Sequence, residues 1–484
     1  MSYRASIGLE VHVQLKTRSK MFCGCAVEFG APPNTRTCPT CLGLPGGLPV
    51  MNHEAVRLTV LTGLMLGCEI PAVSKFDRKS YFYPDVAKNY QITQYDQPFG
   101  RGGSVALPAL AYPKDAQKNL PARERKIPLV RIHLEEDVAK SFHFESSTGI
   151  DFNRAGTALM EIVTEPEIHS PEEAFAFLSA LKQILIYGGV SDADMEKGQL
   201  RCDCNVSVRP NEQSELGAKI EIKNMNSISG VRRALAFEIE RQSAALARGE
   251  SLTQETRGWD DSLGETFLMR TKESAHDYRY FPDPDLVPVK TETLIAEARA
   301  RLPESPAAKR ARFVERYGVS EYDADVLTND LALTSYFEAA AKDAPKAKSI
   351  ANWVLNDLQN ALATAGLSIA ESPLRPNALD ELVQLIERGA ISGKQGKDVF
   401  AEMFATGKNA SVIVKDKGIA QLSDVTALEA LCEEVIAAHP KPAGDFRAGQ
   451  AASLNFLKGQ VMKLSQGRAN PQLAGEILER KLRA

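Results

Sequence analysis

The sequence predicts an α+β protein, in which a strand-rich N-terminal domain is followed by all-helical domains. Alternating apolar and polar residues, together with aromatic and turn residues, are frequent from residue 1 to about 290. From about residue 291 onward the chain is rich in alanine and leucine and is punctuated by Pro and Gly. A period of two is typical of strands, whereas a longer apolar period is typical of helices. The 484 residues suffice for about two to four domains.

The N-terminal domain is expected to contain an extended, mostly antiparallel sheet with flanking helices. One helix begins after Ser170, which is followed by Pro171 and Glu173 in a capping pattern, and ends at Gly188 and Gly189. A second helix is expected from near Gly230 to about residue 249. The segments that alternate as strands are residues 5–15, 127–136, 157–163, 203–209 and 218–223.

Two changes of composition predict the domain boundaries. A proline-rich stretch around residues 282–288 precedes the helical region, and we place a linker near residues 286–305. A second boundary is expected near Gly407. The predicted domains are therefore residues 1–290, residues 291–407 and a small helical tail at residues 408–484.

Composition restricts the class of protein. Hydrophobic residues make up 44% and charged residues 25% of the chain, and the formal net charge is −4. No apolar run approaches the length of a membrane span, and the N-terminus lacks the apolar segment of a signal peptide. We therefore expect a cytoplasmic protein without a membrane, in which cysteines stay reduced. This charge neither requires nor excludes a nucleic-acid partner.

Four cysteines near the N-terminus predict a structural zinc site. Cys23 and Cys25 precede Cys38 and Cys41 by about a dozen residues, and two tight turns can bring four thiolates to one tetrahedral ion. The first pair has one intervening residue instead of the usual two. Unligated core thiols and a redox disulfide remain alternatives. Four thiolates leave no position open for a substrate, so this site does not explain the chemistry.

Carboxylates and an imidazole on strands are the candidate catalytic groups. Glu10 and His12 share one face of the first strand with Gln14, although this could be a solvated face. Glu135 and Glu136 are followed by Asp137, and such adjacent acids repel one another unless a cation lies among them. An exposed acidic turn is the alternative. Glu161 lies in an apolar strand, where a carboxylate needs either an ion-pair partner or a metal.

Two further segments could bind nucleotides. Residues 74–85 combine cations, among them Arg78 and Lys79, with four aromatic rings, and residues 277–283 repeat this mixture. Cations suit phosphates and rings suit a base, but a surface loop with an aromatic anchor is equally consistent. The basic tail carries Lys458, Lys463 and Arg468, which could contact an RNA backbone or simply form a solvated helix face.

Taken together, these segments resemble the B subunit of the aspartyl/glutamyl-tRNA amidotransferase over essentially the whole chain. Each motif is weak by itself, whereas their order along the chain is specific. The matching segments are residues 8–14, 38–45, 74–79, 81–85, 90–98, 133–137, 161–163, 198–203 and 278–282, followed by residues 459–462 and 467–471 near the end.

The resemblance implies an N-terminal cradle domain that phosphorylates, with ATP, the side-chain carboxyl of Asp or Glu mischarged on the Asn or Gln tRNA. Ammonia then displaces the phosphate. It comes from glutamine in the A subunit, an amidase, and travels through a channel, and the small C subunit completes the heterotrimer. No Ser-Ser-Lys amidase signature is found in this chain. The helical and tail domains are expected to grip the tRNA.

We expect His12, Glu136 and Glu161 to ligate Mg²⁺, with Glu10 and Glu135 as further catalytic residues. Arg78 and Lys79 are candidates for contacts to the ATP phosphates. The four cysteines match the zinc-bearing members of the family. Two other hypotheses remain open: a non-catalytic, zinc-containing scaffold that binds tRNA within such a complex, and an amide ligase that does not need tRNA.

Overall fold

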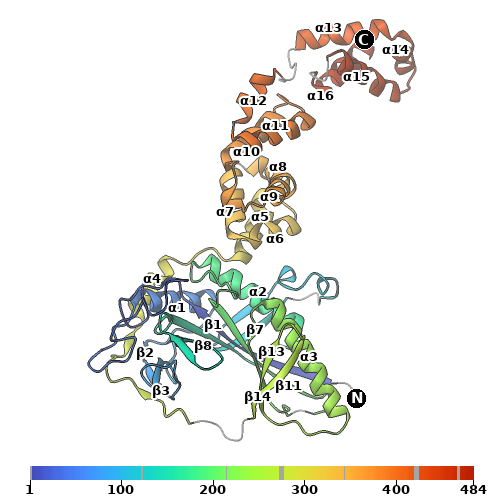
Figure 1. Ribbon diagram of the computed structural model, residues 1–484. Coiled ribbons are helices and arrows are strands. Elements are labelled where there is room, and N and C mark those ends of the chain that lie inside the picture. The colour runs from blue at the N-terminus through green and yellow to red at the C-terminus, as the bar shows by residue number, and fades with distance from the viewer. Residues whose placement is uncertain are drawn as a thin grey trace. The chain divides into compact units, whose positions relative to one another are not determined.

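The computed structural model describes residues 3–120, 124–213, 215–271, 277–342, 344–418, 425–465 and 469–483. The chain divides into two compact units, Met1–Pro306 and Ala307–Ala484. The first unit contains a large sheet with flanking helices, and the second is helical in the part described, so the α+β fold class is confirmed (Figure 1). The division of the chain into three domains stays a prediction.

A nine-stranded sheet forms the centre of the first unit. Its strands follow the order β14-β13-β12-β11-β1-β10-β7-β5, and β6 pairs with another part of β7. The described pairs are antiparallel except for β12 with β13, as the sequence predicts. The strands are β1 (Tyr3–Gln14), β5 (Gly100–Arg101), β6 (Ser104–Leu107), β7 (Arg125–Glu136), β10 (Ala158–Thr164), β11 (Leu200–Pro210), β12 (Ile220–Lys223), β13 (Glu255–Asp260) and β14 (Glu265–Thr271).

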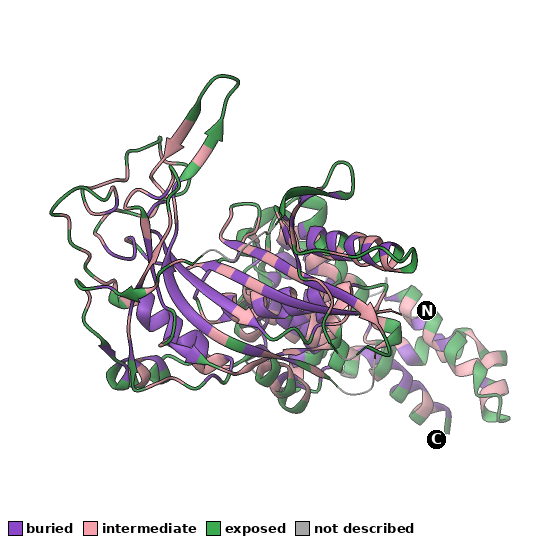
Figure 2. Cartoon of the chain, turned by 90° about the horizontal axis from the view of Figure 1, so that it is seen from below, coloured by how far each residue is buried: buried purple, intermediate pink, exposed green. Residues whose placement is uncertain are grey.

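The alternation of strand β1 decides which face of the sheet is covered. Leu9, Val11 and Val13 are completely buried and belong to the apolar core, whereas His12 on the other face is only partly covered. The central strands are accordingly coloured as buried and intermediate in Figure 2. An antiparallel sheet can cover one face with helices and leave the other polar. The helices of this unit are α1 (His53–Met65), α2 (Pro171–Tyr187), α3 (Ile228–Ala247) and α4 (Glu292–Ala300).

The two helices predicted beside the sheet are both present. The Ser170 hydroxyl caps α2 by accepting a hydrogen bond from the backbone N–H of Glu173, and Ser227 caps α3 in the same way at Gly230. Three small sheets complete the unit: β2 (Val73–Ser74) with β16 (Val289–Lys290), β8 (Lys140–His143) with β9 (Thr148–Asp151), and β3 (Asp77–Ser80) with β4 (Tyr90–Thr93) and β15 (Phe281–Pro282).

The second unit contains two apolar cores, one within residues 313–414 and one within residues 428–482. A turn of π-helix, Trp353–Leu358, lies between α8 and α9. No helix in the described part of the chain is long and apolar enough to cross a membrane. The helices are α5 (Pro306–Tyr317), α6 (Glu321–Asn329), α7 (Leu331–Ala340), α8 (Ala347–Asn352), α9 (Gln359–Ala365), α10 (Pro376–Glu387), α11 (Gly393–Thr406), α12 (Ala410–Lys417), α13 (Val425–Ala438), α14 (Pro440–Arg447), α15 (Ala452–Leu464) and α16 (Pro471–Arg483).

Candidate metal and catalytic site

Three neighbouring strands align a row of polar side chains across the uncovered face of the sheet. In the antiparallel register His12 of β1 lies opposite Glu161 of β10, and Glu161 lies opposite His133 of β7. One oxygen of Glu161, Oε2, is 3.3 Å from the Nε2 atom of each histidine. Glu135, two residues beyond His133, places Oε1 3.8 Å from His12 Nε2. The row therefore brings two imidazoles and two carboxylates together.

Three of these side chains are arranged as metal ligands. One ligand atom from each of His12, Glu135 and Glu161 lies within 4.8 Å of the other two. Both carboxylates are buried, although a buried carboxylate without a cation is costly. Two carboxylate oxygens and one imidazole nitrogen suit a divalent cation that keeps further positions open for substrate oxygens. The donor set therefore fits a catalytic metal site.

In the metal-free cluster, the pKa values of its members show that the two carboxylates favour a positive charge between them. Burial opposes protonation of His12, but the hydrogen bond and charge of Glu161, helped by Glu135, raise its pKa to about 9. Burial and the charge of Glu161 raise the pKa of Glu135, whereas His133 and His12 outweigh burial and hold that of Glu161 well below its usual value. Without a metal, protonated His12 takes the place of a cation between the carboxylates.

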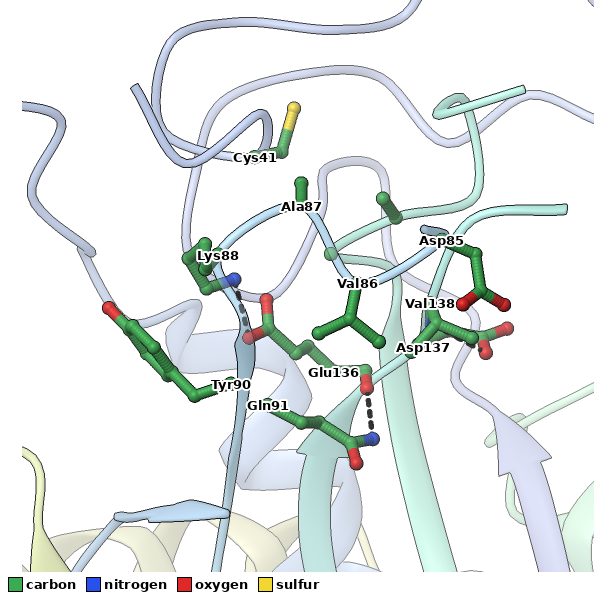
Figure 3. Close-up of a pocket in the computed structure, with 12 residues that line it drawn as sticks. Cys41, Asp85, Val86, Ala87, Lys88, Tyr90, Gln91, Glu136, Asp137 and Val138 are labelled. Atoms are coloured by element: carbon green, nitrogen blue, oxygen red, sulfur yellow. Dashed lines mark hydrogen bonds and ion pairs between the residues drawn. The ribbon is translucent and has the colours of Figure 1, made fainter. Parts of the chain in front are cut away.

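Glu136 does not join this cluster, contrary to the expected ligand set. Consecutive side chains of a strand point to opposite faces, so Glu135 and Glu136 of β7 diverge. Glu136 instead lines a small pocket beside Cys41, where its Oε1 is 2.6 Å from Lys88 Nζ (Figure 3). The same oxygen accepts a hydrogen bond from the backbone N–H of Ile92 at 3.0 Å. Glu135, and not Glu136, lies in the cluster with His12 and Glu161.

The remaining polar strand residues extend the row away from the cluster. Glu10 accepts a hydrogen bond from the Nδ2 of Asn205 at 3.0 Å. Asp203 of β11 lies opposite Glu10 in the register. Lys223 of β12 forms ion pairs with Asp203 and Glu221. The sheet therefore carries a continuous charged strip from β7 to β12. Glu10 belongs to this strip and is not one of the three clustered ligands.

Arg78 and Lys79 differ in their surroundings, although they are adjacent on β3. The Nε of Arg78 is 2.7 Å from Asp283 Oδ2, and its Nη2 is 3.0 Å from Asp285 Oδ2. Its charge is therefore already balanced within the protein. Lys79 Nζ instead lies 5.6 Å and 4.9 Å from the ring centroids of Tyr81 and Tyr278. Lys79 is the better placed of the two to contact a phosphate.

The four N-terminal cysteines converge as their spacing predicts. One sulfur atom of each of Cys23, Cys25, Cys38 and Cys41 lies within 4.8 Å of the others, and all four are free thiols. The Cys23 thiol and the Cys38 backbone N–H lower the pKa of Cys41 to about 4 against the effect of burial. Four sulfur donors with a stabilised thiolate fit a tetrahedral ion. The cluster could therefore hold a metal, and its identity as zinc stays a prediction.

The predicted tRNA contacts of the tail are only partly described. Lys458 and Lys463 both belong to α15, and Lys463 is exposed. The side chain of Lys458 crosses α16 at Gly475, where an added Cβ would approach the lysine Cε to 2.2 Å. Arg468 lies outside the described residues. The role of these residues in binding tRNA stays a prediction.

Sequence reasoning missed two residues of these sites. His133 was not selected, although its alternation with Arg131 and Glu135 places it on the polar face of β7. Lys88 and its contact with Glu136 were not foreseen, because only tertiary structure brings residues so far apart together. The apolar Ile132 and Leu134 also indicate that Glu136, at the next alternate position, belongs to the covered face.

A cluster of imidazole and carboxylate groups that could hold a cation, on an uncovered face of a sheet, is typical of a catalytic domain. Residues 5–297 match the family model described as the GatB/GatE catalytic domain, and residues 335–482 match that of the GatB domain. Two similar proteins are named as the B subunit of aspartyl/glutamyl-tRNA(Asn/Gln) amidotransferase. The protein from Methylacidiphilum infernorum is 57% identical over 100% of this chain and 99% of its own length. The protein from Opitutus terrae is 50% identical over the whole length of both chains. The chain therefore belongs to the family of amidotransferase B subunits.

Proposed function

We propose that this protein amidates the side-chain carboxyl of Glu mischarged on the Gln tRNA, of Asp mischarged on the Asn tRNA, or of both, after activating it with ATP. The names of its relatives contain both substrates and the reaction type. The observation that carries the proposal is the convergence of His12, Glu135 and Glu161 on one partly open face. A surface built only to bind RNA would not gather buried carboxylates there.

The proposed reaction has two steps. An oxygen of the substrate carboxylate attacks the γ-phosphorus of ATP, the bond to the bridging oxygen breaks, and ADP leaves. Ammonia then attacks the carbonyl carbon of the acyl phosphate, and inorganic phosphate leaves with the electron pair of the broken C–O bond and takes up one proton from the nitrogen. Water must be kept out between the steps because it would hydrolyse the acyl phosphate.

The clustered residues have defined roles in this scheme. We assign His12, Glu135 and Glu161 as the ligands of Mg²⁺, which when bound would neutralise charge on the phosphates and the substrate carboxylate. The buried His133 holds Glu161 from the side opposite His12. The hydroxyl of Thr93 donates a hydrogen bond of 3.3 Å to Glu135 Oε2 and so fixes the direction of that carboxylate. Lys79 is assigned to the phosphates of ATP.

The source of ammonia lies in a partner. We propose a heterotrimer in which an amidase, the A subunit, releases ammonia from glutamine and the small C subunit completes the assembly, because the relatives are named as subunits. The charged strip formed by Asp203, Glu221 and Lys223 provides polar groups on the way to the cluster. We assign to it a part of the lining along which ammonia enters. The proposed location is the cytoplasm.

The tail is proposed to bind the tRNA through α15. Lys463 is exposed, and no ion pair of Lys458 or Lys463 occurs among the described residues. Arg480 and Lys481 of α16 are instead paired with Glu429 and Glu433. Free ammonium groups gain more from contact with phosphates than paired ones do. The Lys463→Glu variant should therefore weaken tRNA binding more than Lys481→Glu, as measured by filter binding at several salt concentrations.

The test of the function is ATP-dependent amidation of mischarged tRNA with ammonium as nitrogen donor, which bypasses the amidase partner. Wild type, His12→Ala and Glu135→Ala are compared, with Glu240→Ala on the exposed side of α3 as control. We expect activity in wild type and control and its loss in both site variants. A wild-type protein that binds tRNA but stays inactive, even with both partner subunits, would favour the non-catalytic scaffold. Amidation of free Glu or Asp would favour a ligase independent of tRNA.

A further inference from the structure

Lys20 is a lysine whose side chain is completely removed from solvent. Its exposed fraction is 0%, and it is among the largest fully buried side chains of the described chain. It precedes Met21 and Phe22, which belong to the apolar core, and comes just before the first cysteine pair. Burial of an ammonium group is strongly unfavourable unless an anion and hydrogen-bond acceptors surround it. The ammonium group of Lys20 therefore needs such partners within the protein.

The side-chain contacts of Lys20 lead to the cysteine cluster and to the loop beside it. The Nζ atom is 3.5 Å from the sulfur of Cys41 and 3.2 Å from the carbonyl oxygen of Phe152. The backbone N–H of the same residue donates to the carbonyl oxygen of Cys25 at 3.0 Å. Lys20 thus contacts one member of each cysteine pair, Cys25 through its backbone and Cys41 through its side chain.

The side-chain partner of Lys20 in the cysteine cluster is the sulfur of Cys41. Among the described residues no carboxylate oxygen lies within 4.0 Å of Nζ. Lys88, which lines a pocket together with Cys41, shows the contrast, because its Nζ is 2.6 Å from Glu136. The carbonyl oxygen of Phe152 accepts a hydrogen bond but carries no net charge. A metal binds this sulfur as a thiolate, so Lys20 directly contacts an atom of the proposed metal site.

Close packing around Gly156 fixes this arrangement. Gly156 has a φ of +83°, and an added Cβ would lie 3.4 Å from the Cβ of Cys41 and 3.5 Å from the Cδ of Lys20. Its carbonyl oxygen accepts a hydrogen bond from the backbone N–H of Met21 at 2.7 Å. The loop therefore lies against the lysine stem and the cysteine together.

We propose that Lys20 is the buried counter-charge of a metal–thiolate centre formed by the four cysteines, and that it determines how tightly the metal is held. Four thiolates around a divalent ion carry two excess negative charges, and an ammonium group at one sulfur offsets one of them. An N–H donor directed at a ligand sulfur also orients it, as partners beyond the direct ligands do in other metal sites. This assignment rests on the proposed zinc site and adds the residue that balances its charge.

The experiment compares zinc binding by the full-length wild type with that of Lys20→Met, which keeps the length of the side chain and removes its charge. The control is Lys16→Met, because Lys16 lies on the surface in an ion pair with Asp192. Zinc content is measured first, followed by competition with a chromogenic chelator and by the shift in Tm that zinc produces. We expect one tightly bound zinc in wild type and control, and affinity lower by about tenfold or more in Lys20→Met.

A second variant separates charge from hydrogen bonding and guards against loss of folding. Lys20→Gln keeps a donor for the Phe152 carbonyl but lacks the charge, so it should also bind zinc more weakly and show a smaller zinc-induced rise in Tm. Equal zinc affinity in the folded variants and wild type would overturn the assignment, as would a failure of both variants to fold even with added zinc. Absence of zinc from wild type would refute the zinc site itself, while the ammonium-driven amidation assay would still report on the proposed function.

Discussion

His12 and Glu161 face each other in register across the antiparallel pair of β1 and β10, with Nε2 3.3 Å from Oε2. This pairing joins residues that are far apart in the sequence at the centre of the polar face. Because Glu161 also faces His133 on its other side, one carboxylate is held between two imidazoles. The two imidazoles fix the direction of the carboxylate before any substrate binds, which is the pre-organisation that catalysis of phosphoryl transfer requires.

Glu135 and Glu136 should respond differently to the same substitution. We expect Glu135→Gln to lower the rate of ammonium-driven amidation at least about 100-fold, because it changes a proposed ligand of the metal. Glu136→Gln should retain most of the activity and lower the free energy of unfolding by about 1–3 kcal/mol, because Lys88 loses its carboxylate partner. Rates at several magnesium concentrations and urea unfolding of both variants test this. Equal loss of activity in the two variants would show that Glu136 belongs to the site.

Lys79 and Arg78 provide a second matched pair. Lys79→Met should raise the KM for ATP or lower kcat by about ten- to a hundredfold while Tm stays unchanged, because its positive charge acts on Glu135 and is assigned to the phosphates of ATP. Arg78→Met should mainly lower Tm, because it releases the buried Asp283 from its ion pair. Steady-state kinetics and thermal unfolding are measured on both proteins. A loss of ATP affinity confined to Arg78→Met would reverse the assignment.

The raised pKa of His12 makes the stability of the metal-free protein depend on pH. The folded state holds the proton more tightly than an ordinary imidazole of pKa 6.5, since the pKa of His12 is about 9. The contribution is therefore complete below pH 6.5 and is lost as the pH rises through 9, and it amounts to about 2–3 kcal/mol. Unfolding followed from pH 6 to pH 9.5 with a chelator present should show this fall in wild type. In the His12→Asn variant the free energy of unfolding should fall less over this pH range. An identical fall in the variant and in wild type would contradict the assignment.

The completely buried Glu238 stabilises the contact between α3 and the end of the sheet. Its carboxylate accepts hydrogen bonds from Gln242 Nε2 at 3.0 Å and Thr266 Oγ1 at 2.9 Å, and forms an ion pair with Arg241. Glu238→Leu should lower the free energy of unfolding by about 3–5 kcal/mol, because it leaves the partly buried Arg241 and two buried donors without their acceptor. Urea unfolding measures this change. Exposed Glu240→Leu on the same helix is the control, and an equally small effect of both would refute the prediction.

Much of the local structure could be predicted from the sequence. Apolar alternation identified β1, β7, β10, β11 and β12, because a strand must bury one face and expose the other. Ser170 marked the start of α2, since its hydroxyl satisfies a backbone donor that the helix leaves unpaired. The spacing of the cysteines was enough to predict that they meet, because two short turns leave few other arrangements.

The residue pattern of β7 by itself places Glu136 on the covered face of the sheet. The alternation of Ile132 and Leu134 with His133 and Glu135 determines the faces of β7, and it assigns Glu135 rather than Glu136 to the polar row. The side of a strand on which a residue lies is a local property, so tertiary information was not needed for this choice. Which residue lies opposite it on the neighbouring strand depends on the tertiary structure.

Only the tertiary structure decided which strands are neighbours. The position of Glu161 between His12 and His133, and the burial of Lys20 against Cys41, both depend on pairings between distant segments. The sequence by itself determined strand faces, helix ends and the convergence of the four cysteines, because these follow from backbone periodicity and short-range geometry. The cluster of charges followed from strand order and register, which the packing of the whole core selects and no single segment encodes.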